Sequence, residues 1–145
     1  MIGQYAQKQY SNTQISTADR LRLVVMLYEG AISFLRQAMT KMERKDIAGK
    51  GILIGKAQDI ISELDNALNF SEGGEIATNL HKLYGFINRS LIRINMKWDP
   101  KSIERVIQIL SRLKDAWNEI CGRPSAEFSS SRPAVGRAYI ERQVL

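Results

Sequence analysis

His81 and Cys121 are the side chains of this sequence best suited to metal binding or nucleophilic catalysis, and each residue type occurs once. A di-iron or di-manganese site in a helical bundle requires Glu-x-x-His pairs that point inward, but the residue three positions before His81 is Thr78. A structural zinc site needs four His or Cys ligands, and this chain offers two that are far apart in sequence. We therefore expect His81 to be a surface or half-buried ring.

Cys121 lacks the surroundings of a catalytic thiol. No histidine lies near it in sequence, and a position in the last turn of a helix opposes a lowered thiol pKa. The chain has no GxxxxGK[ST] phosphate-binding motif, and its acidic residues lie on charged faces without an apolar pocket to raise their pKa. We expect Cys121 to be an inert apolar filler and the protein not to be an enzyme.

The composition is that of one globular domain. The chain has 145 residues, of which 44% are hydrophobic and 25% charged, and a formal net charge of +6. Its Lys and Arg residues are interleaved with Glu and Asp, which is typical of solvated helix faces and argues against nucleic-acid binding. The single cysteine excludes an internal disulfide and suits a reducing compartment. With no signal-peptide h-region at the start and no apolar run of membrane-spanning length, we expect a cytosolic protein that does not insert into membranes.

Apolar residues recur at helical spacing along most of the chain and predict an all-α protein, an antiparallel up-down four-helix bundle. The expected helices span about 19–44, 47–69, 71–98 and 100–120, within a bundle domain at 17–121. Thr17 or Asp19, Asp46, Ser71 and Asp99 are the expected N-caps, and Pro100 suits the first turn after Asp99. Residues 1–16 form a polar N-terminal arm, and residues 122–145, rich in Ser, Arg, Gly and Pro, form a tail expected to be flexible.

Several apolar residues lie outside the predicted core stripes. In the third helix the stripe runs from Ile76 to Trp98, whereas Ile92 and Met96 fall on the opposite, polar side. Ile52 lies off the stripe of the second helix, close to Gly51 and Gly55, and Ile107 flanks that of the fourth. The glycines allow a close approach of another backbone or else mark a frayed first turn. The apolar residues form either a groove for an amphipathic partner or a surface covered by the arm or the tail.

Four segments together resemble the cytosolic flagellar export chaperones for flagellin, the FliS family. They are VVMLYEGAISFLRQA, AQDIISELDNAL, GGEIATNLHKLYGFINRSLIRIN and LKDAWNEI, and the resemblance spans about residues 10–120. The element at Leu27-Tyr28-Glu29-Gly30 and the string GGEIATNL are distinctive in combination.

The resemblance implies a helical bundle that uses no cofactor and binds the disordered C-terminal segment of flagellin along its outside. It implies that the protein prevents premature polymerisation and assists delivery to the flagellar type III export gate. Tyr10 and Ile15 match the spacing of the family's N-terminal arm, although Ile2 with Tyr5 resembles an alternative form. Asp19-Arg20 replaces the family's common Ser-Pro helix start, which keeps a capping side chain and loses the stiffening proline.

The partner-binding residues expected from these arguments are Tyr10, Ile15, Ile52, Ile92, Met96 and Ile107. A structural or adaptor bundle, in which the same apolar patches hold a permanent partner or form a homodimer, is the alternative.

Overall fold

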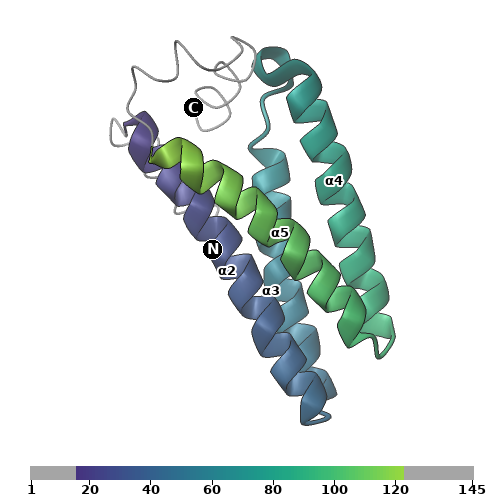
Figure 1. The fold of residues 1–145 in the computed structure, drawn as a ribbon. Coiled ribbons are helices and arrows are strands. Elements are labelled where there is room, and N and C mark those ends of the chain that lie inside the picture. The colour runs from purple at the N-terminus through teal and green to yellow at the C-terminus, as the bar shows by residue number, and fades with distance from the viewer. Residues whose placement is uncertain (1–15, 123–145) are drawn as a thin grey trace.

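The computed structural model describes residues 16–122, which form four α-helices. They are α2 (Thr17–Glu43), α3 (Ile47–Asn66), α4 (Phe70–Met96) and α5 (Pro100–Cys121). Consecutive helices run in opposite directions, so the predicted all-α antiparallel bundle is confirmed (Figure 1). Residues 1–15 and 123–145, which make up nearly all of the predicted arm and tail, lie outside the described residues.

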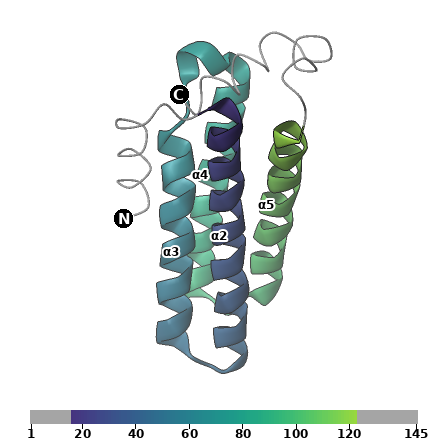
Figure 2. The ribbon, with the colours of Figure 1, turned by 90° about the vertical axis from the view of Figure 1, so that its left-hand side faces the viewer.

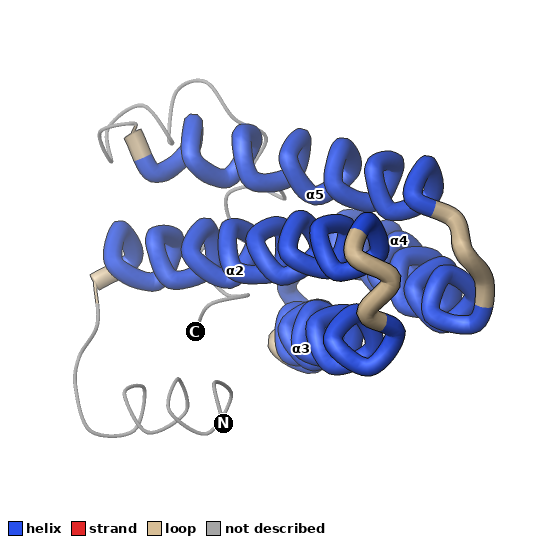
Figure 3. The backbone as a smooth tube through the Cα atoms, turned by 90° about the horizontal axis from the view of Figure 1, so that it is seen from below, coloured by secondary structure: helices blue, strands red, loops and turns tan. Residues whose placement is uncertain are grey.

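Helix α2 is the central element of the bundle. It packs along most of its length against α3 on one side and α5 on the other, and α4 lies behind it (Figures 2 and 3). Its buried face is wide, because Tyr28, Ala31, Leu35 and Ala38 are all fully buried. Helix α4 packs against α3 more than against α5, and the α4–α5 seam is the thinnest between neighbouring helices.

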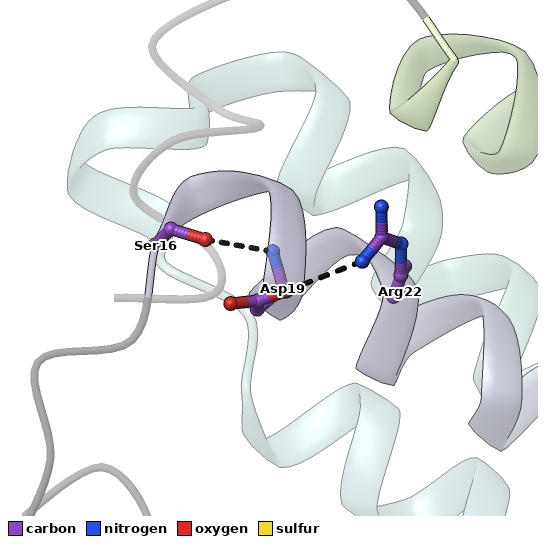
Figure 4. Close-up of polar contacts among 3 residues, drawn as sticks. All are labelled: Ser16, Asp19 and Arg22. Carbon is purple, nitrogen blue, oxygen red and sulfur yellow. Dashed lines mark hydrogen bonds and ion pairs between the residues drawn. The ribbon is translucent and has the colours of Figure 1, made fainter.

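Polar side chains fix where the helices begin. Asp46 and Asp99 are N-caps as predicted, accepting hydrogen bonds from the backbone N–H groups of Gly49 and Ser102 at 2.9 and 3.2 Å. The cap of α2, however, is Ser16, whose Oγ accepts a hydrogen bond from Asp19 N at 3.2 Å (Figure 4). The prediction of Thr17 or Asp19 was wrong because the helix begins earlier than its apolar pattern. Asp19 instead binds Arg22 one turn further on, at 3.4 Å.

Helix α4 departs most from its expected course. Asn69 caps it rather than Ser71, and Gly74 has the non-helical dihedral angles φ 53° and ψ −124°, which break the helix in its second turn. The helix ends at Met96, because Lys97 is extended. Both changes alter the predicted stripe: Ile76, just after the break, is exposed, and Trp98, beyond the helix, is 53% exposed. Within the described part of the chain, no helix combines the length and apolar character that a membrane span requires.

Candidate partner-binding surface

Three exposed apolar side chains define the surface that we call the α3–α4 patch. Ile52 on α3 is 62% exposed, and Ile92 and Met96 on α4 are 52% and 81% exposed. The helical phase that placed them outside the core is therefore confirmed. An exposed cluster of large aliphatic side chains on a folded bundle is typical of a surface that another molecule covers.

The contacts between α3 and α4 bring these side chains to the same level of the bundle. Asn88 Nδ2 donates a hydrogen bond to Ser62 Oγ at 3.2 Å, and Lys50 Nζ donates one to the carbonyl of Asn95 at 3.3 Å. These pairs set an antiparallel register in which the first half of α3 lies beside the last turns of α4. Ile52 is therefore at the same end of the bundle as Ile92 and Met96, on the neighbouring helix.

Two glycines on α3, Gly51 and Gly55, leave the surface near Ile52 without side chains. A Cβ added at Gly55 would meet no atom within 4 Å, and one added at Gly51 would meet only Asn95 Oδ1, at 3.6 Å. Both glycines are in regular helix, so the frayed-turn interpretation is wrong. The close approach of another backbone is not found either, because among the described residues no backbone atom of another helix comes within 4 Å of a Cβ added at Gly51 or Gly55. These small residues leave open space on α3 beside the exposed Ile52.

Lys50 anchors the end of the patch where α4 terminates. Although it is a lysine, it is only 4% exposed. Its ammonium donates to the carbonyl of Asn95 in the last turn of α4 and lies 6.0 Å from the centre of the Trp98 ring. A positive charge at this position is stabilised by the helix dipole and by the aromatic face. The sequence pattern did not reveal these contacts of Lys50 with the end of α4 and with Trp98, because a lysine is ordinarily exposed to solvent.

The remaining predicted site residues do not join this patch. Ile107 is only 8% exposed and belongs to the core, so its assignment to an exposed patch was wrong. The reason is that α5 packs against both α2 and α4, and its buried face is wider than a single stripe. Tyr10 and Ile15 lie outside the described residues.

The distinctive Tyr-Glu-Gly element has a structural role that sequence patterns did not reveal. The hydroxyl of Tyr28 on α2 is hydrogen-bonded to that of Tyr84 on α4, across the centre of the bundle, and Trp117 of α5 is a further hydrogen-bonding partner. Burial raises the pKa of Tyr28 to about 12, and its two hydrogen bonds act in the opposite direction. A Cβ at Gly30 would lie 3.3 Å from Ile60 Cδ1, so this glycine allows α3 to pack closely on α2.

The residues considered for chemistry have structural surroundings. His81 is exposed, with its Nδ1 2.7 Å from Asp65 Oδ1 and its ring edge-on to Phe70, as expected for a surface ring. Cys121 is half-buried, and burial raises the pKa of its thiol, which opposes nucleophilic reactivity. Among residues 16–122 no three His, Cys, Asp or Glu side chains are grouped to hold a metal ion.

Comparison with known proteins identifies the family of this chain. Residues 1–124 match the family model described as flagellar protein FliS. The chain is 39% identical over 109 residues to the flagellar secretion chaperone FliS of Vibrio cholerae, across 75% of this chain and 80% of the relative. It is 38% identical over 132 residues to that of Salmonella typhimurium, across 90% and 96%. To the flagellar secretion chaperone FliSB of Pseudomonas aeruginosa it is 39% identical over 124 residues, across 83% and 98%. The chain therefore belongs to the FliS family, a family of flagellar secretion chaperones and not of enzymes.

Proposed function

We propose that this protein is a cytoplasmic export chaperone that binds the disordered C-terminal segment of flagellin. Binding prevents flagellin from polymerising prematurely and assists its delivery to the flagellar type III export gate. The observation that carries the proposal is the exposed α3–α4 patch on a chain of the flagellar secretion chaperone family.

The shape of the patch suits a ligand that is unfolded before it binds. Ile52, Ile92 and Met96 are exposed, with open space beside Ile52, and none of them lies in a deep cavity. A disordered segment that folds on binding covers such a shallow surface and loses part of the interaction energy to ordering. The result is moderate affinity, which allows the chaperone to release its cargo at the export gate.

The double substitution Ile92→Ser/Met96→Ser tests the proposal. Because both side chains are exposed, the free energy of unfolding should change by only about 0.5 kcal/mol. Binding of a flagellin C-terminal peptide, measured by isothermal titration calorimetry, should weaken by about 1–3 kcal/mol, as expected when an interface anchor is lost. Met26→Ser is the matched control, since Met26 is an equally exposed apolar residue on α2.

Each alternative outcome has a distinct meaning. If the double variant binds flagellin as well as the wild type does, the binding site lies elsewhere on the bundle and the proposal for this patch fails. If the free protein is a dimer that the double variant dissociates, the patch is the interface of an adaptor or homodimer. A loss of several kcal/mol of stability would place Ile92 and Met96 under a fifth element of the chain.

A further inference from the structure

A second hollow on the described surface lies along the thin seam between α4 and α5. It encloses about 370 Å³ near the connection between the two helices. Its apolar lining comprises Phe86, Ile94, Val106 and Ile109. Phe86 is 45% exposed and Ile109 is partly exposed, whereas Ile94 and Val106 are buried and form the floor of the hollow. We call this hollow the α4–α5 groove.

The rim of the α4–α5 groove is strongly basic. Arg93, Lys97 and Arg105 line it, all three are exposed, and no salt bridge joins any of them to another described residue. The one acidic lining residue is Asp99, whose carboxylate accepts hydrogen bonds from the backbone N–H and the hydroxyl of Ser102 at 3.2 and 2.5 Å. Within the described part of the chain, Arg93 donates a hydrogen bond only to the neutral hydroxyl of Ser90, at 3.4 Å. The hydrogen bonds from Ser102 lower the pKa of Asp99, and Arg105 lies close enough to lower it further. The rim therefore carries three positive charges against one carboxylate that is already engaged as a helix cap.

We propose that the α4–α5 groove binds an acidic amphipathic segment of a partner protein, with its apolar side chains on the groove lining and its carboxylates on the basic rim. This site is distinct from the α3–α4 patch, because none of Ile52, Ile92 and Met96 lines the groove.

Charge complementarity excludes the rest of this chain as the occupant. Residues 1–15 contain Lys8 and no acidic residue. Residues 123–145 carry Arg123, Arg132, Arg137 and Arg142 against Glu127 and Glu141. Neither segment complements a positive rim. A nucleic acid would satisfy the cations but would leave the aliphatic lining uncovered, so a protein segment is the better match.

The test uses two synthetic helical peptides and the full-length protein. The acidic probe has Leu at helical spacing flanked by Glu, and the basic probe has Lys in place of each Glu. We expect the acidic probe to bind and the basic probe not to bind, with an affinity that falls as salt is added. The variant Arg93→Glu/Arg105→Glu should lose about tenfold or more in affinity for the acidic probe and gain affinity for the basic one. The control variant Arg36→Glu/Arg44→Glu makes the same change in net charge, on α2 and at its C-cap. It should bind the acidic probe as the wild type does.

The inference is overturned if the two probes bind the wild type equally, if neither binds, or if the α2 control loses as much affinity as the groove variant. It is also overturned if the groove variant loses affinity only for single-stranded DNA, which would make the groove a nucleic-acid site. Circular dichroism checks that each variant is folded. Because Ile92→Ser/Met96→Ser should leave probe binding unchanged, failure of this inference and failure of the flagellin proposal are distinguishable.

Discussion

Tyr28 links three of the four helices through one buried hydroxyl group. Replacing it with Phe keeps the ring and removes the hydrogen bonds to Tyr84 and Trp117. We expect Tyr28→Phe to lower the free energy of unfolding by about 1–2 kcal/mol in urea denaturation, because a buried hydrogen bond is lost while its partner stays buried. The double variant Tyr28→Phe/Tyr84→Phe should lose less free energy of unfolding than the sum of the losses of the two single variants, by about 1 kcal/mol. Strict additivity would show that the two hydroxyls do not interact.

The same tyrosine predicts how stability depends on alkaline pH. Burial raises the pKa of Tyr28 from 10.0 to about 12, so the folded state holds the phenolic proton more tightly than the unfolded state does. The resulting stabilisation is complete below pH 10 and is lost as the pH rises toward 12. Between these limits the wild type should lose about 2 kcal/mol more than Tyr28→Phe does. Parallel slopes for the two proteins in urea titrations at several pH values would contradict this expectation.

Gly74 on α4 and Gly55 on α3 differ in backbone conformation, and this difference predicts opposite effects of replacing them with alanine. A Cβ would meet no atom within 4 Å at either Gly74 or Gly55, but Gly74 has φ 53° and Gly55 lies in regular helix. We expect Gly74→Ala to destabilise the protein by about 1–3 kcal/mol, since alanine rarely adopts that backbone conformation. Gly55→Ala should stabilise it by up to about 1 kcal/mol, through higher helix propensity. Thermal denaturation of both variants measures the effect of backbone conformation alone, because neither added Cβ meets another atom. An unchanged stability of Gly74→Ala would argue against the break in α4.

The observed helices show which features the spacing of apolar residues predicts and which it does not. Helical spacing of apolar residues located all four described helices and the exposed positions of Ile52, Ile92 and Met96, because the 3.6-residue period directly reports which side faces the core. It failed where the period is interrupted, at the Gly74 break and after Met96, and so it buried Trp98 wrongly. It also failed for Ile107, because burial there depends on a second neighbouring helix rather than on the phase of α5.

Sites formed between helices were beyond the sequence pattern altogether. The hydroxyl contact of Tyr28 with Tyr84 joins residues 56 positions apart, and the contact of Lys50 with Asn95 joins residues 45 apart. The basic rim of the α4–α5 groove likewise combines residues of two helices that appear, in sequence, as ordinary charged positions of solvated faces. Such assemblies become visible only when the helices are placed side by side.

At the scale of the whole molecule, α4 is the element best placed to couple binding to the rest of the bundle. It packs less extensively than α2 does, and it carries residues of both the α3–α4 patch and the α4–α5 groove. One polar contact that joins it to α2 across the core is the hydrogen bond between the hydroxyls of Tyr84 and Tyr28. A partner at either site therefore contacts the helix that is least constrained by the core, which favours binding without disruption of α2, α3 and α5.

The N-terminal arm, residues 1–16, supplies the last prediction. The arm is proposed to cover an apolar groove of the free protein through Tyr10 and Ile15, in competition with flagellin. Each anchor contributes about 1 kcal/mol or more by burial, enough to bias this competition without blocking it. Deleting residues 1–15 should therefore raise affinity for a flagellin C-terminal peptide by about fivefold or more in calorimetry.

Stability separates the covering role of the arm from a role in folding. The described core lies within residues 16–122, and Ser16 caps α2, so deletion of residues 1–15 should change the free energy of unfolding by only about 0.5 kcal/mol. Deletion of residues 1–16 removes the cap as well and should cost about 1 kcal/mol more. Affinity for flagellin should rise equally in both truncated proteins, since the cap does not contact the proposed surface. If affinity is unchanged in both, the arm does not cover the binding site, and its Tyr10 and Ile15 must serve another partner.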